Sequence, residues 1–223
     1  MKNKVVAIIP IKSVSKRVKN KNFRKINKKP LYEFLLNKLH FCNFDEIYVD
    51  TDSTRIKEFC RKKKIKIINR LKYLSKDSAN GNDLLNYHCK KIQAKYYFQL
   101  FITAPLLSIK TINNCIRILK TKNNIDSILT VKKIYSWFWF KNKPVNYNPE
   151  TLPRSQDAMP IIQESTGLYG IKSNILKKKK CRIGVRPFFY QISENESLDL
   201  DTEDDFRYLE YYVKRYLPST NNK

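Results

Sequence analysis

Five cationic side chains follow directly after an apolar run near the start of the chain. The run Val5 to Ile9 ends at Pro10, and the loop after it contains Lys12, Lys16, Arg17, Lys19 and Lys21. An α/β protein builds its anion site in such a loop, beyond the carboxyl end of a strand, and fixed cations there can hold a polyphosphate during a reaction. A solvated basic loop is the alternative interpretation.

A second group with possible chemistry lies far away in the sequence, in Asp199-Leu200-Asp201-Thr202. If this segment is a strand, both carboxylates point to one side and Leu200 points to the core. Paired carboxylates suit magnesium, which keeps several waters and bridges substrate phosphates. Helix capping with surface charge is the alternative. Together with the basic loop, the pair would supply the cation site of a nucleotide enzyme.

Other polar groups follow the next apolar runs. Asp50 to Ser53 ends one run and is expected to form a turn and a cap for the next helix. Arg70 ends another run, and Asp77 to Asp83 opens a helix, so that side chains there can read the edge of a base. His40 and His88 are isolated and are interpreted as satisfied surface or core histidines.

Several chemistries lack their motifs in this sequence. The basic loop contains no glycine, which excludes a Walker-type loop, and no Gly-x-Ser-x-Gly elbow is present. The five cysteines are scattered, odd in number and without Cys-x-x-Cys spacing, which argues against both a disulfide framework and a zinc site.

Short apolar runs alternate with amphipathic segments through the first 130 residues, a pattern typical of a mostly parallel sheet wrapped by helices. Strands are predicted over 4–10, 46–51, 65–68, 96–102 and 126–132. Helices are predicted over 30–40, 53–63, 79–93 and 109–120, with Asp77-Ser78 and Ser108 as caps of the last two. The fold class is therefore α/β with a doubly wound sheet.

The pattern changes at 134–165, where aromatic residues and prolines replace the alternation. We predict an extended arm, and an exposed apolar arm is a common dimerisation device because large apolar patches rarely stay bare. Packing of this segment onto its own domain is the alternative. Strands at 167–171 and 188–192 and a helix over 204–216, capped by Thr202, are expected to complete one domain over 1–223. Lys177 to Lys180 is expected to be a solvated loop.

Composition bounds the remaining choices. The chain has 223 residues, of which 42% are hydrophobic, enough for one sizeable core. No stretch approaches the roughly 20 apolar residues that span a bilayer, so a cytoplasmic protein without membrane contact is expected. The net charge of +25 calls for an anionic partner. Nucleic acid is one candidate, although the lysines are spread along the whole chain.

Taken together, these motifs resemble the acylneuraminate cytidylyltransferase family, the CMP-sialic acid synthetases and their relatives. The resemblance runs in order from Val5 to about Glu210. It is carried by Ile9-Pro10, Ser15-Lys16-Arg17, Asn20-Lys21-Asn22, Thr51-Asp52, Arg70, Asp77-Ser78-Ala79 with Asp83, Thr103 with Pro105-Leu106, Arg154 with Gln156-Asp157, Gly167 with Tyr169, and Asp199-Leu200-Asp201-Thr202.

The resemblance implies a fold similar to nucleotide-diphospho-sugar transferases, a homodimer formed through the arm, and CTP with Mg²⁺ as the reactants besides an acidic sugar. It implies Lys21 and Asp201 as catalytic residues and Asp199 with Asp201 as magnesium ligands. The triphosphate would be held by Lys12, Ser15, Lys16 and Lys21, cytidine by Asn22, Arg70 and Ser78, and the acidic sugar by Lys141, Arg154 and Tyr169.

The chain also departs from the family's pattern. Lys12 stands where arginine is usual, and Ser13-Val14 replaces a glycine pair. The run Phe101 to Leu107 lacks the glutamine that faces the sugar and the closing arginine. Arg182-Ile183 stands where some members place aromatic residues against the substrate. These departures affect residues that the family uses to bind phosphate and to select the sugar.

The leading hypothesis is a CTP-dependent cytidylyltransferase that activates an acidic nonulosonic sugar and releases pyrophosphate. The same fold acting on another acidic sugar, such as Kdo, is an enzymatic alternative. A catalytically weakened relative that only binds nucleotide is a second alternative. A basic nucleic-acid-binding protein is the least favoured, and steep salt dependence of generic DNA or RNA binding would identify it.

Overall fold

The computed structural model describes residues 3–15, 18–76 and 78–217, and its centre is a seven-stranded sheet in the order β11-β7-β10-β6-β1-β4-β5. Neighbouring strands are parallel except at β10, which runs antiparallel to both β6 and β7. The strands of this sheet are β1 (Val5–Ile11), β4 (Glu46–Thr51), β5 (Lys66–Asn69), β6 (Tyr96–Leu100), β7 (Ser127–Ile134), β10 (Ile161–Lys172) and β11 (Pro187–Gln191).

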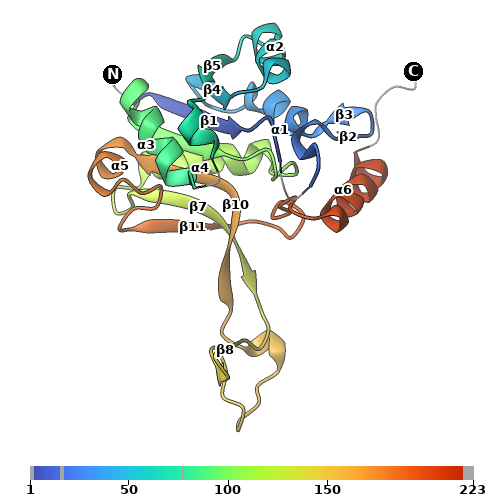
Figure 1. Ribbon diagram of the computed structural model, residues 1–223. Helices are drawn as coiled ribbons and strands as arrows, with labels where there is room; N and C mark the ends of the chain where they lie inside the picture. Colours follow the sequence, from blue (N-terminus) through green and yellow to red (C-terminus); the bar gives the residue numbers. More distant parts are fainter. Residues whose placement is uncertain (1–2, 16–17, 77, 218–223) are drawn as a thin grey trace.

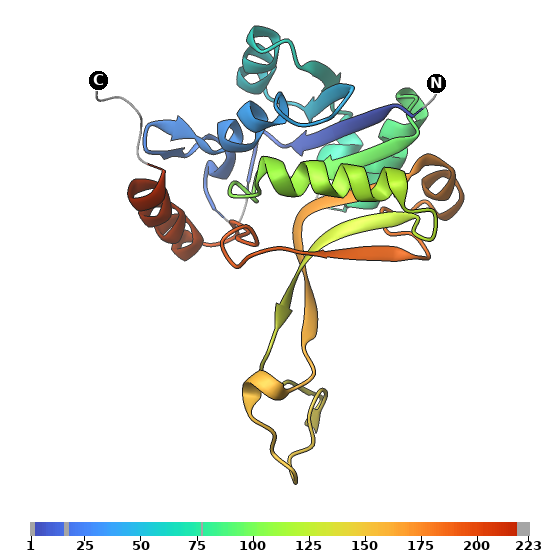
Figure 2. The same cartoon turned by 180° about the vertical axis from the view of Figure 1, so that it is seen from behind.

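Helices cover both faces of the sheet, as Figures 1 and 2 show from opposite sides. One face packs against α1, α2 and α4, and the other packs against α3 and α5. The predicted doubly wound, mostly parallel fold is confirmed. No helix in the described ranges is long and apolar enough to cross a membrane. The helices are α1 (Leu31–Leu39), α2 (Thr54–Lys62), α3 (Gly81–Lys91), α4 (Ile109–Thr121), α5 (Ser173–Lys179) and α6 (Glu203–Tyr216).

Local sequence explains most of these elements. The residues Val5 to Ile9 of β1 are all buried, as expected of a strand covered by helices on both faces. Side-chain oxygens of Ser53, Ser108 and Thr202 accept backbone N–H groups at the starts of α2, α4 and α6. The predicted caps at Ser108 and Thr202 are confirmed.

Three local expectations are wrong. The cap of α3 is Asn80, in a reciprocal capping box with Asp83, rather than Ser78; Asp77 lies outside the described residues. The lysines 177–179 form the last turn of α5 instead of a loop, because cations are favoured at a helix C-terminus. Residues 199–201 are not a strand, although Leu200 is fully buried between the two aspartates.

The segment between β7 and β10 leaves the body as an arm (Figure 1). The two strands stay paired as far as Ile134 and Ile161, and the short hairpin β8 (Trp139–Phe140) and β9 (Lys143–Pro144) lies farther out. Asn146 ties the two sides of the arm together by donating to the carbonyls of Ser136 and Met159. The predicted extended arm is confirmed.

A small apolar cluster joins the two ends of the chain. Val18, Ile26 and Leu31 pack against Leu200 and Phe206. This contact positions the basic loop beside the acidic segment that precedes α6. The remaining short elements are the 3₁₀ turns η1 (Lys21–Phe23), η2 (Lys72–Ser75) and η3 (Ser155–Asp157) and the hairpin of β2 (Lys25–Ile26) and β3 (Lys29–Pro30).

Candidate functional site

The basic loop and the acidic segment meet directly. The Nζ of Lys21, on η1, lies 3.0 Å from Oδ1 of Asp201 and also donates to the carbonyl of Leu200. Lys21 is almost fully buried, and the Asp201 side chain is about one-third exposed, at 36%. The structure therefore brings a cation and a carboxylate that are 180 residues apart in the sequence to one place.

Four further hydrogen bonds shape the basic loop. The backbone N–H and the hydroxyl of Ser13 both donate to the carboxylate of Asp52, at 2.6 and 2.9 Å. The Asn22 amide donates to the Lys12 carbonyl at 2.7 Å, and the Lys12 ammonium donates to the Lys76 carbonyl at 3.4 Å. Asp52, which directly follows β4, thus fixes the basic loop at Ser13.

The loop forms one wall of a pocket of about 480 Å³. Lys12, Ser15, Lys21 and Asn22, four of the predicted triphosphate and cytidine residues, line it together. Lys16 lies outside the described residues. The other lining residues are Pro10, Ser13, Val14, Asp52, Ser75, Phe101, Ile102 and Thr103.

Asp199 lies close by in the chain but faces a different hollow, of about 510 Å³, which Thr166 and Glu164 also line. Its Oδ2 accepts a hydrogen bond from the Thr166 hydroxyl. Its Oδ1 is buried and has no hydrogen-bond partner among the described residues. A buried carboxylate oxygen without a donor is unfavourable, so the site suits a cation.

The described residues contain no group of three His, Cys, Asp or Glu side chains that could hold a metal ion by themselves. Two carboxylates are enough for magnesium, which usually takes one or two and completes its shell with waters and substrate phosphates. Asp199 and Asp201 are the residues that would hold it.

Arg70 lies at a buried ion-pair network. Its Nε lies 3.1 Å from Oδ1 of Asp50, and Nε2 of His88 lies 2.9 Å from Oδ2 of the same carboxylate. Burial raises the pKa of Asp50, but the hydrogen bond with His88 and the charge of Arg70 outweigh it and lower that pKa below its ordinary value. His88 is a core histidine, but the prediction that it is satisfied holds only for Nε2, because its buried Nδ1 has no hydrogen-bond partner among the described residues. Asp50 proves to be a buried ion-pair partner and not a turn residue.

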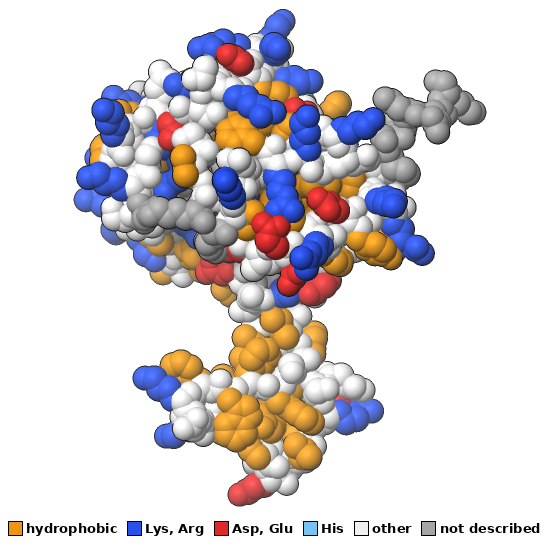
Figure 3. Space-filling view, turned by 45° about the vertical axis from the view of Figure 1, so that its right-hand side comes forward, with side chains coloured by type: hydrophobic (Ala, Val, Ile, Leu, Met, Phe, Trp, Pro, Cys, Tyr) orange, Lys and Arg blue, Asp and Glu red, His pale blue; other side chains and the backbone are white. Residues whose placement is uncertain are grey.

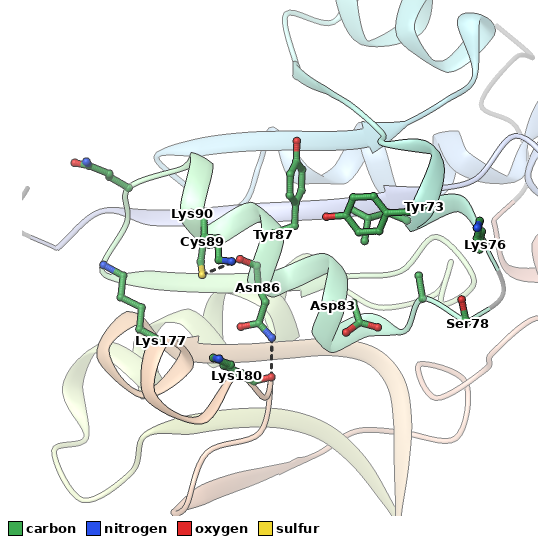
Figure 4. A pocket seen from close by; sticks show the side chains of 13 residues that line it. Tyr73, Lys76, Ser78, Asp83, Asn86, Tyr87, Cys89, Lys90, Lys177 and Lys180 are labelled. Carbon is green, nitrogen blue, oxygen red and sulfur yellow. Dashed lines mark hydrogen bonds between the residues drawn. The ribbon is translucent and has the colours of Figure 1, made fainter.

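Ser78 lines a third hollow, of about 960 Å³, between η2, α3 and α5 (Figure 4). Lys76, Lys90, Lys177 and Lys180 surround this hollow. The Lys76 carbonyl, which accepts from Lys12, connects it to the basic loop. The structure thus places Ser78 in a different pocket from Lys12 and Lys21, and the two pockets adjoin at Ser75 and Lys76.

The three predicted sugar-binding residues are not brought together. Lys141 and Arg154 lie on the arm, away from the body, and Arg154 pairs with Asp157 at 2.6 Å. Tyr169 is buried in β10, where its hydroxyl donates to Glu164 at 2.6 Å. Burial raises the pKa of Tyr169. The guanidinium of Arg182 covers the Tyr169 ring at 3.6 Å from its centroid.

The sequence did not point to Thr166 or to the structural role of Asp52, and it marked Arg182 only as a departure from the aromatic residues of the family. Asp52 was part of a recognisable motif, but its contact with Ser13 joins two separate strand ends. Thr166 and Arg182 act through contacts with Asp199 and Tyr169, which only the packed sheet creates. No local pattern in the sequence predicts either of these two contacts.

Comparisons with known proteins fit this geometry. The model of the cytidylyltransferase family matches residues 6–211. N-acylneuraminate cytidylyltransferase of Streptococcus agalactiae serotype V is 27% identical, over 91% of this chain and 52% of that protein. Pseudaminic acid cytidylyltransferase and UDP-2,4-diacetamido-2,4,6-trideoxy-beta-L-altropyranose hydrolase of Helicobacter pylori is 24% identical, over 85% of this chain and 38% of that protein. The chain spans about half the length of the first relative and less of the second.

One solved structure aligns with this chain over almost the full length of both proteins. CMP:2-keto-3-deoxy-manno-octonic acid synthetase complexed with CTP superimposes with a TM-score of 0.72, over 95% of this chain and 99% of that chain. The two sequences are 17% identical, so this likeness concerns the fold. It agrees with the sheet order and the two helical layers described above.

Proposed function

Because the chain belongs to the cytidylyltransferase family, we propose that it transfers CMP from CTP to an acidic nonulosonic sugar and releases pyrophosphate. The observation that carries the proposal is the contact between Lys21 and Asp201. It joins the cationic loop to the carboxylate segment at the carboxyl ends of the strands, where α/β sheets bind nucleotides. Since the reaction consumes CTP, we also propose a cytoplasmic location.

For this reaction the protein has to position the two substrates and neutralise the charge of the phosphates. A sugar hydroxyl attacks the α-phosphorus, the bond to the β-phosphate oxygen breaks, and pyrophosphate leaves with the electron pair. Lys12, Ser15 and Lys21 line one pocket and are proposed to hold the triphosphate. Magnesium, held by Asp199 and Asp201, would neutralise phosphate charge and favour ionisation of the attacking hydroxyl.

Cytidine is proposed to lie toward Asn22, Arg70 and Ser78. Asn22 is held in place by its bond to the Lys12 carbonyl. Arg70 already uses two of its nitrogens on Asp50 and its side chain is only 1% exposed, so a base could reach it only through its remaining N–H groups. The amide of Asn22, the guanidinium of Arg70 and the hydroxyl of Ser78 are hydrogen-bond donors, and the carbonyl of cytosine accepts hydrogen bonds from such groups.

We expect the protein to release pyrophosphate from CTP only when Mg²⁺ and a nonulosonic acid are both present. The measurement is a coupled pyrophosphate assay with a panel of acidic sugars, Kdo included, followed by mass spectrometry for the CMP-sugar. ATP in place of CTP is the control and should give at least about tenfold less product. No release with any sugar would contradict the proposal and favour a nucleotide-binding relative without activity.

We propose further that the arm pairs with a second copy of the chain. Hydrophobic side chains gather on it (Figure 3), and Trp139 and Phe140 are 58% and 66% exposed. Patches of this kind on a projecting element rarely stay solvated. A second copy would also let Lys141 and Arg154 approach a sugar that the arm of their own chain does not reach.

Replacing both Trp139 and Phe140 by serine is expected to convert a dimer into a monomer. Size-exclusion chromatography with light scattering measures the mass directly. Thermal unfolding of the body should change little, because neither residue belongs to its core clusters. Phe41→Ser, at an aromatic residue of the body that is 72% exposed, is the matched control and should leave the mass unchanged. An unaltered dimer in the double variant would refute this role of the arm.

A further inference from the structure

The loop that follows α5 delivers an arginine to the carboxyl edge of the sheet. The guanidinium carbon of Arg182 lies 3.6 Å from the centroid of the Tyr169 ring and 5.7 Å from that of Phe101. Phe101 in turn lines the pocket that contains Lys12 and Lys21. Arg182 therefore stands at the border of the proposed reaction site, on the side of β6 and β10.

This guanidinium has no carboxylate partner among the described residues. Its one side-chain hydrogen bond goes to Oε1 of Gln99, at the limiting distance of 3.5 Å. The nearby carboxylate of Glu164 accepts instead from the Tyr169 hydroxyl. Arg182 is half-buried, so its charge is partly removed from water without being paired. A guanidinium in this situation favours an anionic ligand, which it can grip with two parallel N–H groups.

The position of Arg182 is held from both sides of the loop. The buried Asp126 accepts the backbone N–H groups of Val185 and Arg186, at 2.9 and 3.0 Å. A Cβ at Gly184 would lie 2.0 Å from that carboxylate, so only glycine fits there. On the other side, the backbone N–H of Arg182 donates to the Asn82 side chain at 2.8 Å. The guanidinium is thus in place before a ligand binds, which lowers the entropy that binding must overcome.

We propose that Arg182 binds the carboxylate of the sugar substrate and selects acidic sugars at this position. The inference rests on the proposed function and names the residue that recognises the acid. Within one chain, Arg154, the other candidate for that carboxylate, lies on the arm and pairs with Asp157, so that it could reach the sugar only from a second copy. The run Phe101 to Leu107 beside the site carries no cation. Among the described residues, Arg182 is a cation beside Phe101 and Tyr169 that is not already assigned to the triphosphate.

The test compares Arg182→Gln with Arg182→Lys in steady-state kinetics. N-acetylneuraminate is the first probe, followed by the other acidic sugars. Loss of one charge-assisted pair corresponds to a KM for the sugar that is roughly 10–100-fold higher in Arg182→Gln. The KM for CTP should change less than about twofold. Arg182→Lys keeps the charge but not the two parallel N–H groups, so its KM for the sugar should lie between those of the wild type and Arg182→Gln.

The carboxamide of the same sugar is the second arm of the experiment. The wild-type protein should have a higher KM for the carboxamide than for the acid. Arg182→Gln should have similar KM values for the acid and the carboxamide. Arg186→Gln is the matched control, because this exposed arginine lies on the same loop and its backbone bond to Asp126 remains. An unchanged sugar KM in Arg182→Gln, or an equal loss on acid and amide, would overturn the proposal.

Calorimetric titration of N-acetylneuraminate in the presence of CTP and Mg²⁺ separates this inference from the proposed function. If no pyrophosphate is released but binding weakens in Arg182→Gln, the carboxylate role stands while the proposed reaction fails. Equal binding by wild type and variant would overturn the role of Arg182 itself. Thermal unfolding of each variant confirms that the loop is intact.

Discussion

Asp201→Asn is expected to reduce turnover by about 100-fold or more, because it removes a negative charge that pairs with Lys21 and that is proposed to hold magnesium. Lys21 would keep its bond to the Leu200 carbonyl but lose the carboxylate 3.0 Å away. Fewer fixed charges would then hold the triphosphate in line with the attacking hydroxyl. The effect should appear chiefly in kcat, since the charge acts on the phosphates as the bond breaks.

The experiment measures kcat by pyrophosphate release and stability by thermal unfolding on the same preparations. Asp204→Asn provides the matched control: this aspartate lies three residues farther on and its side chain is 85% exposed. It should leave turnover within about twofold of wild type, as surface substitutions usually do. A folded Asp201→Asn protein with full turnover would remove Asp201 from the catalytic site.

The second large effect is expected on stability, at Asp50. Asp50→Asn should lower the free energy of unfolding by about 3–5 kcal/mol, because it leaves the buried Arg70 guanidinium without its carboxylate. The side chains of Asp50, Arg70 and His88 are at most 1% exposed, so water cannot compensate for the loss. Urea denaturation at neutral pH measures the difference.

The contribution of Asp50 also depends on pH in a defined direction. Its pKa in the folded protein lies below the ordinary aspartate value, which is about 3.9. The stabilisation is therefore fully present above that value and is lost as the pH falls through the lower, folded-state pKa. The difference between wild type and Asp50→Asn should be constant near neutrality and narrow below about pH 4.

Glu58→Gln is the control for both measurements, because Glu58 is an exposed acid on the neighbouring helix α2. Its change in unfolding free energy should stay within about 0.5 kcal/mol. A loss of less than about 1 kcal/mol in Asp50→Asn would mean that the network contributes little, as happens when a buried pair only balances its own desolvation.

Much of the fold could be predicted because its determinants are local. The apolar run of β1, the caps at Ser108 and Thr202 and the prolines of the arm act within a few residues of where they stand. The same holds for the order of strands and helices through the first 130 residues. One local prediction was wrong because two residues that can cap a helix, Ser78 and Asn80, both precede α3, and Asn80 forms the cap.

The candidate site was only partly predictable. Lys12, Ser15, Lys21 and Asn22 come together because they belong to one loop after one strand. Lys141 and Arg154 did not join them, since the arm carries both away from the body. Arg70 was expected at a base but is anchored on Asp50, a partner that lies on the adjacent strand and is hidden from any local pattern.

The amino-acid sequence by itself determined the α/β class, the basic loop, the acidic segment and the projecting arm, because hydrophobic period and turn chemistry act over short distances. Only the tertiary structure decided that Lys21 meets Asp201, that Asp199 keeps a buried oxygen without a partner in the described part of the chain, and that Arg182 covers Tyr169. These contacts join distant segments, and their geometry depends on how the apolar cluster around Val18 and Leu200 and the neighbouring strands β6 and β10 pack.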